Sequence, residues 1–155
     1  MTTQCSHFKG FQFTTPSEAT LLGAPLSSGS AMDIILSALH DNLKHAVNRL
    51  RLLSSHDALV LLKTSLGGPK LQHVLRSSPC YDHPLLRQID ATLKSAVTQI
   101  CNVTLSDEQW SQASLPVRHG GLGIRSMSMI APSAFLASAA GTQRLQTLIL
   151  QKCQI

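Results

Sequence analysis

Aromatic residues are scarce in this chain: they make up 4% of the sequence, with one Trp and one Tyr. Aromatic side chains are enriched in strands, so this scarcity argues against an aromatic-rich β-sandwich. Hydrophobic residues nevertheless make up 43% of the chain, and leucine and alanine are plentiful among them. We therefore expect long aliphatic side chains to fill a core of packed helices.

The chain also lacks a disulfide pattern, because its four cysteines, at positions 5, 80, 101 and 153, do not pair into a compact framework. The N-terminal sequence has no apolar signal core, so we expect reduced thiols and an intracellular protein, cytoplasmic or nuclear. No apolar run approaches the length that crosses a membrane, so we expect no membrane partner.

Acidic residues are missing from the last third of the chain. The last one is Glu108, and the only charged side chains after it are Arg118, Arg125, Arg144 and Lys152. The whole chain has 13 Lys and Arg against 8 Asp and Glu, a formal net charge of +5. An acid-free basic segment favours a polyanionic partner, although an ordinary basic protein would have the same balance.

Apolar residues recur every three or four positions in several segments, which predicts helices. We expect the clearest helix at 31–53, with Ser30 as its cap, and further helices at 54–66, 69–78, 83–102, 106–115, 126–141 and 142–155. One or two short strands and a loop are expected at 7–30. The fold class is therefore mainly α, with a short N-terminal extended or hairpin segment.

Local patterns add five expectations. Ser106 and Gln109 form a capping box that starts a short helix, and Trp110 in that helix is expected to be buried in the core. The run from Ala58 to Leu62 is apolar nearly all round, which predicts burial on several sides. Asp90 lies four residues before Lys94, the favourable order for a surface ion pair on a helix. Gly141 is expected to end the helix that begins near residue 126.

The segment LPVRHGGLGIRS, residues 115–126, has the composition of a ligand-binding loop. Its GLGIRS part nearly matches a dinucleotide-binding fingerprint, but no acid follows to hold a ribose, and the lysine of a Walker loop is missing. We interpret Gly120, Gly121 and Gly123 as residues of a structural turn. The alternative reading is a phosphate-backbone contact through Arg118, His119 and Arg125.

No pattern in the chain predicts catalysis, a metal or a cofactor. Cys5 with His7, and Cys80 with His83, are two half-sites whose spacing is not that of a zinc site. The nucleophile motif G-x-S-x-G is missing, and no adjacent aspartates are present for a two-metal site. We therefore expect no catalytic residues, no metal ligands and no cofactor.

Three ordered blocks carry a resemblance: LLGAPL, then HDALVLLKTSLGGPKLQHVLRSSPC, then WSQASLPVRHGGLGIRSMSMIAPSAFLASAAG. From about Thr20 to Thr142 the chain resembles the region after the palm in reverse-transcriptase-like proteins of non-LTR (LINE-type) retroelements. The resemblance implies that residues 1–30 are remnants of the last, primer-grip-like palm strands. It further implies that residues 31–141 form a helical thumb and connection, followed by a helical tail at 142–155.

The resemblance also implies a function. A thumb holds template–primer duplex, so Lys70, Arg76, Arg118 and Arg125 are the expected backbone contacts. The palm, with its metal-binding aspartates, has no counterpart here, so we expect a non-catalytic fragment that binds RNA or DNA backbone without sequence preference. The alternative is a remnant that acts only through protein contacts, or through self-association by apolar surface left exposed without the palm.

Overall fold

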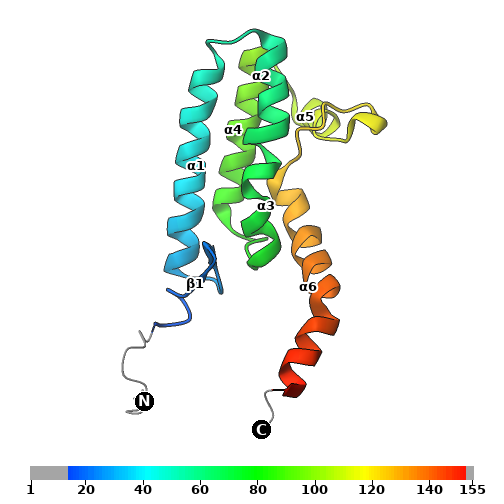
Figure 1. Cartoon of the computed structure of the whole chain (residues 1–155). Coiled ribbons are helices and arrows are strands. Elements are labelled where there is room, and N and C mark those ends of the chain that lie inside the picture. The colour runs from blue at the N-terminus through cyan, green and yellow to red at the C-terminus, as the bar shows by residue number, and fades with distance from the viewer. Residues whose placement is uncertain (1–13, 153–155) are drawn as a thin grey trace.

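The computed structural model describes residues 14–152, and its fold is mainly α-helical, as predicted (Figure 1). The elements, in order, are β1 (Thr20–Leu21), β2 (Ala24–Pro25), α1 (Ser30–Leu50), α2 (Ser55–Leu61), the π-helical turn η1 (Leu62–Leu66), α3 (Gly68–Ser77), α4 (Pro84–Cys101), α5 (Asp107–Ala113), the 3-10 turn η2 (Val117–His119) and α6 (Met127–Lys152). The part of the predicted N-terminal extended segment before residue 14 lies outside the described residues.

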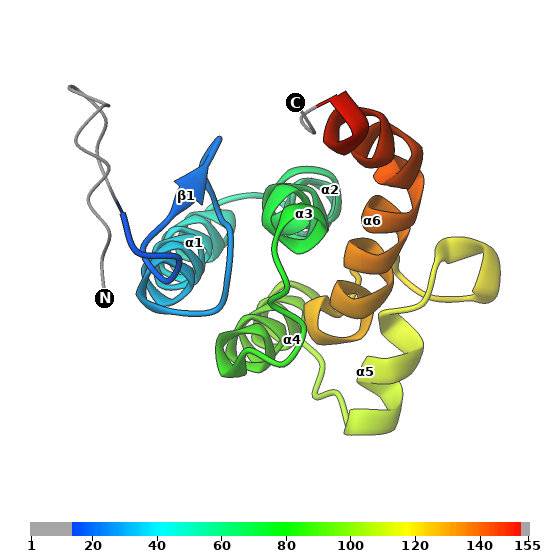
Figure 2. The same ribbon diagram turned by 90° about the horizontal axis from the view of Figure 1, so that it is seen from below.

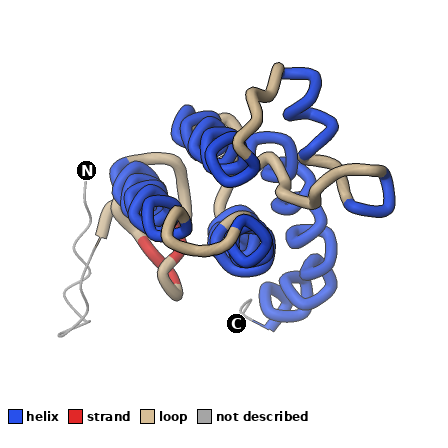
Figure 3. The backbone as a smooth tube through the Cα atoms, turned by 90° about the horizontal axis from the view of Figure 1, so that it is seen from above, coloured by secondary structure: helices blue, strands red, loops and turns tan. Residues whose placement is uncertain are grey.

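The two strands form a minimal antiparallel hairpin, in which Leu21 pairs with Ala24. The connecting residues Leu22 and Gly23 both have positive φ, of 51° and 79°, as a tight primed turn requires. The hairpin is fastened to α3 and the residue that follows it, because Ser78 Oγ donates to Pro25 O at 2.6 Å and His73 Nε2 lies 3.0 Å from Leu22 O. Figure 3 shows these strands in red at one edge of the helices.

The core lies between α1, α2, η1, α3, α4 and the start of α6. Along α1, Met32, Leu43, Val47 and Leu50 are buried, in agreement with the predicted stripe. Ser30 does not cap α1, which corrects our expectation: Gly29 occupies the cap position, and the Ser30 hydroxyl points to Ser17 O at 3.5 Å instead. The N-terminus of α1 is therefore tied to the preceding loop by Ser30.

The segment from α2 to η1 packs along one face only. Ala58 and Leu62 are buried, but Val60 and Leu61 are exposed. The prediction of burial on several sides was therefore wrong, because α4 is the main long-helix neighbour of α2. As predicted, the Gly-Gly-Pro sequence separates this segment from the next helix, with Pro69 in the first turn of α3.

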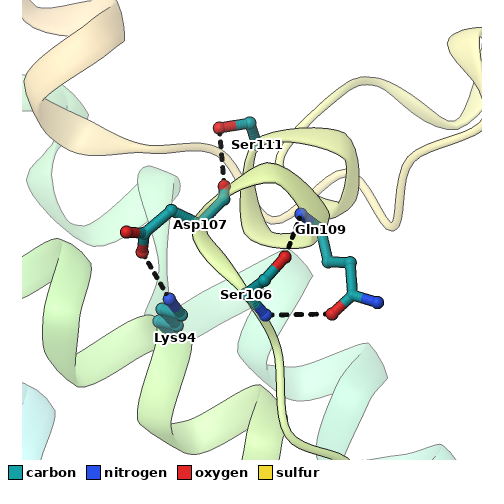
Figure 4. A network of polar contacts seen from close by, with 5 residues as sticks. All are labelled: Lys94, Ser106, Asp107, Gln109 and Ser111. Atoms are coloured by element: carbon teal, nitrogen blue, oxygen red, sulfur yellow. Dashed lines mark hydrogen bonds and ion pairs between the residues drawn. The ribbon is translucent and has the colours of Figure 1, made fainter.

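The helix α5 begins at the predicted capping box, in which Gln109 N donates to Ser106 Oγ at 3.2 Å and Ser106 N donates to Gln109 Oε1 at 2.9 Å (Figure 4). Trp110 packs against the core but is only partly buried. Our expectation of a buried Trp110 was too strong, because α5 lies at the outside of the bundle (Figure 2).

The helix α6 is one continuous element of 26 residues. The expected end at Gly141 was wrong: Gly141 lies inside the helix, and the predicted boundary between 141 and 142 divides it. Nothing lies within 4 Å of a Cβ built at Gly141, so the glycine sits on an exposed stretch and costs the helix only about 1 kcal/mol. The first half of α6 packs on α3 and α4, while the last turns extend past the ends of the other helices (Figure 1).

Candidate functional site

The glycine loop between α5 and α6 is a closed turn. Gly120 and Gly123 have φ of 78° and 77°, a region that favours glycine. A Cβ at Gly121 would lie 2.1 Å from Leu115 O, so the loop backbone approaches closer there than any side chain allows. The turn is closed by Gly123 N, which donates to Leu115 O at 2.9 Å.

The loop is anchored at its end by Asp90 of α4, which caps the N-terminus of α6. The buried carboxylate accepts from Met127 N, from Ser126 Oγ at 2.7 Å, and from both the backbone and the hydroxyl of Ser128. The negative charge also stabilises the positive end of the α6 dipole. Arg125, directly before this cap, is therefore held beside the start of α6.

The predicted Asp90–Lys94 ion pair was wrong, because Asp90 faces α6 instead. Lys94 Nζ binds Asp107 Oδ1 at 2.7 Å in the first turn of α5 (Figure 4). This hydrogen bond and the Lys94 charge lower the pKa of the Asp107 carboxyl. Two side chains of α4, Asp90 and Lys94, thus join α4 to the two helices that flank the glycine loop.

A groove of about 1010 Å³ runs between η1, the first turns of α3, the glycine loop and the first half of α6. Three cationic side chains line it: Lys63, Arg118 and Arg125. Its apolar lining comes from Leu62, Leu75, Pro116, Val117, Ile124, Ile130, Ala134 and Ala137. None of the residues that line this groove is acidic, so its charge is positive.

Lys63 lies over the glycine loop. A Cβ at Gly123 would be 2.9 Å from Lys63 Cε and 3.2 Å from its Nζ, so the absence of a side chain at position 123 makes room for the lysine. Sequence reasoning missed Lys63, which was counted only as part of a helix. The sequence feature that could have drawn attention to Lys63 is that it is the only charged residue between Asp57 and Lys70.

The other predicted contacts do not join this groove. Gly68, Gln72 and Leu75 line it from α3, and at about 100° per residue Lys70 lies on the opposite side of that helix. Arg76 is exposed and also outside the lining. His119 is exposed next to the groove, and its Nε2 accepts from Arg118 Nε at 3.2 Å. Of the five predicted residues, the groove thus contains Arg118 and Arg125.

Other chemistry-bearing side chains of the described residues serve the fold. His83 caps α4 by accepting from Leu85 N and lies 2.8 Å from Asp33 Oδ1. Cys80 is buried, and burial raises the pKa of its thiol. Between residues 14 and 152 no three His, Cys, Asp or Glu side chains gather where they could hold a metal ion; Cys5 and His7 lie outside that range.

Comparisons with models of known families, with curated proteins and with solved structures found no match for the chain. Among the helices of residues 14–152, none combines the length and the apolar character that a membrane span needs.

Proposed function

We propose that this chain is a helical module that binds the sugar–phosphate backbone of nucleic acid in the groove between η1, α3, the glycine loop and α6. The proposal gives the chain a binding role and no catalytic step. The observation that carries it is the convergence of Lys63, Arg118 and Arg125, from two separate parts of the sequence, on one groove without an acid. Cations in such a groove neutralise phosphates and release condensed counterions.

The three groove cations are not bound to carboxylates of the described residues, which leaves their charges available to a ligand. Within residues 14–152 the ion pairs with carboxylates involve Lys44, His83 and Lys94, and none involves a groove cation. No aromatic side chain lines the groove, so the platform on which single-stranded bases stack is missing there. We therefore propose backbone binding that is indifferent to base sequence.

The resemblance to the thumb of LINE-type reverse transcriptases supports the same proposal, because a thumb holds template–primer duplex. We propose a retroelement-derived origin for the chain on that ground. With about three phosphate contacts, the dissociation constant should be on the order of micromolar or weaker at physiological salt.

A binding titration across a series of salt concentrations tests this function, with labelled duplex DNA, RNA–DNA hybrid and single strands as ligands. We expect a slope of log K against log salt of about −3 for the duplex, and a slope flatter by about one to two units in the double variant Arg118→Gln, Arg125→Gln. The matched control is Arg49→Gln, Arg51→Gln, which removes the same charge from exposed positions at the end of α1, outside the groove.

Three outcomes would contradict the proposal. They are no binding at low salt, an equal change in slope in the control variant, and loss of folding in the groove variant. The last result would mean that Arg118 and Arg125 serve the turn itself.

A second candidate function is action through protein contacts alone. It is favoured by the large apolar side chains that α6 exposes, among them Met129, Leu136, Leu145 and Ile149. Absence of any salt-dependent nucleic-acid binding, together with a protein interface on α6, would select this candidate.

A further inference from the structure

The link between α1 and α2, from Arg51 to Ser54, is a short exposed segment at one end of the molecule. Every residue from 51 to 57 is exposed, and Leu52 is 86% exposed. Figure 1 shows this link at the top of the bundle, at the end opposite to β1 and the last turns of α6. A modifying enzyme can therefore reach the link without displacing another element of the described structure.

Two arginines precede the hydroxyl of Ser54 in this link. Arg51 lies three residues before it and Arg49 five, and no other Ser or Thr of the chain has arginine at both of these positions. Both arginines are exposed, and neither forms an ion pair with a carboxylate of residues 14–152. Protein kinases that are directed by arginine recognise such a pair with carboxylates of their own, because guanidinium groups pair bidentately with carboxylates.

We propose that Ser54 is a phosphorylation site for an arginine-directed serine/threonine kinase. In this reaction Ser54 Oγ forms a bond to the γ-phosphorus of ATP, and the bond from that phosphorus to the oxygen it shares with the β-phosphate breaks. ADP leaves, and the hydroxyl proton passes to the catalytic aspartate of the kinase. The kinase and magnesium-bound ATP supply the phosphoryl group, and this chain supplies the acceptor hydroxyl and the two recognition arginines.

The backbone of the link fits this role. An acceptor hydroxyl must reach the γ-phosphate in line with the leaving oxygen, which requires an accessible, extended chain. Ser54 has an extended backbone, with φ of −61° and ψ of 149°. Before it, two turn hydrogen bonds hold the link, from Leu52 N to Arg49 O at 3.2 Å and from Leu53 N to Leu50 O at 3.0 Å. Opening these bonds extends the link, and Arg49 follows when the last turn of α1 frays, as helix ends do.

Two other hydroxyl residues have an arginine three residues before them, and the structure makes both of them poor acceptors. Ser128 is half-buried in the first turn of α6, and its hydroxyl donates to Asp90 Oδ2. Thr147 lies inside α6, and its hydroxyl donates to Gln143 O at 3.0 Å. Neither can extend without unwinding α6, so Ser128 and Thr147 are internal controls for the accessibility of Ser54.

The neighbour of Ser54 on the other side is Asp57, three residues after it. Ser54 Oγ donates to Asp57 Oδ2 at 2.7 Å and accepts from Asp57 N at 3.3 Å. A kinase directed by acids would use this carboxylate, whereas an arginine-directed kinase would use Arg49 and Arg51. We favour the arginines, because they have no carboxylate partner in residues 14–152, whereas the Asp57 carboxylate is bound to Ser54 itself.

The test incubates the folded full chain with magnesium-bound ATP and a kinase that selects arginine three and five residues before the acceptor. A parallel reaction contains a kinase that selects an acid three residues after it. Mass spectrometry locates the phosphate, and initial rates are measured for wild type and three variants: Ser54→Ala, the double variant Arg49→Gln, Arg51→Gln, and Asp57→Asn. Far-ultraviolet circular dichroism of each variant checks that the helices are intact.

We expect the arginine-directed kinase to phosphorylate Ser54 in wild type and, at the same rate, in Asp57→Asn. The rate should fall by about tenfold or more in the double arginine variant, because each lost charged hydrogen bond weakens recognition by about that factor. No phosphate on Ser54, faster reaction at Ser128 or Thr147, or a wild-type rate in the double arginine variant would overturn the proposal. Phosphorylation by the acid-directed kinase alone, lost in Asp57→Asn, would also overturn it. The reactions contain no nucleic acid, so their failure leaves the groove proposal standing.

Discussion

The bundle of α1, α3 and α4 and the segment from the glycine loop through α6 use their polar side chains differently. In the bundle, polar groups join elements: His40 Nε2 lies 2.9 Å from Thr92 Oγ1 between α1 and α4, and Ser78 fastens the hairpin. Arg118, Arg125 and Arg144 of the second region form no ion pair with a carboxylate of the described residues, and neither do Arg49, Arg76 and Arg87 of the bundle. These polar contacts of the bundle stabilise the fold, whereas our proposal assigns Arg118 and Arg125 of the second region to a ligand.

The two regions also differ in their apolar side chains. Leu36, Leu86 and Leu93 of the bundle are fully buried, whereas Leu145 of α6 is more than half exposed. The start of α6 belongs to the core, since Met127 and Ala131 are 0% and 1% exposed, so the contrast is between the bundle and the last turns of α6. Substitutions in the bundle should then change the free energy of unfolding, whereas substitutions in the last turns of α6 should leave it nearly unchanged.

The largest effect is expected from Leu93→Ala in the bundle. Leu93 is 0% exposed, so the cavity should lower the free energy of unfolding by about 2–5 kcal/mol. The matched substitution in the second region, Leu145→Ala, should change it by less than about 0.5 kcal/mol. Urea denaturation measures both, and equal losses would break the contrast between the two regions.

A smaller effect is expected from Asp90→Ala, at the junction of the two regions. The change leaves Met127 N and the hydroxyl of Ser126 without their acceptor, which should cost about 1–3 kcal/mol. The control Asp41→Ala removes a carboxylate whose partner Lys44 is exposed, and should cost at most about 1 kcal/mol. Hydrogen exchange should speed up in the first turn of α6 for Asp90→Ala only; faster exchange confined to α4 would contradict the capping role.

The smallest effect is a pH dependence from His40. Burial, and to a lesser extent the Lys44 charge, lowers the pKa of this imidazole below 6.5. The folded state then binds fewer protons than the unfolded state, so the free energy of unfolding falls as pH drops below about 6.5. Thr92 Oγ1 donates its hydrogen to Gln88 O at 3.0 Å, so it accepts the hydrogen bond from His40 Nε2–H. The variant His40→Gln keeps an N–H donor at this position and removes the titrating group.

Between pH 7.5 and pH 5.5, wild type should therefore lose more stability than His40→Gln, by at most about 1 kcal/mol. Thermal or urea unfolding at the two pH values gives this difference. Equal losses in the two proteins would show that another group titrates.

Much of the fold follows from local pattern. The spacing of Met32, Leu43 and Val47 predicted α1, the Ser106–Gln109 capping box predicted the start of α5, and the Gly-Gly-Pro sequence predicted the break before α3. Each of these signals lies within a few residues of the element it specifies. Such signals are readable from sequence because the partners are neighbours in the chain.

The errors come from contacts between distant residues. The partners of Asp90 lie 36 to 38 residues away, at the start of α6. The rule that pairs residues four positions apart on a helix surface therefore wrongly predicted an ion pair with Lys94. Gly141 does not end α6, because a glycine ends a helix only where the chain leaves it, and inside a helix it costs only about 1 kcal/mol. Lys63 entered the groove only because η1 and the glycine loop meet in space. The spacing of apolar residues along the chain does not predict contacts between residues that are distant in the sequence.

The most direct measurement of the central claim is an amide nuclear magnetic resonance titration of the full chain with a short duplex at low salt. Our account predicts that the largest shifts cluster on the groove, at Lys63, Gly123 and Arg125, and that they disappear as salt is added. Shifts centred on Lys70 and His73, on the opposite side of α3, or no shifts at all, would contradict it.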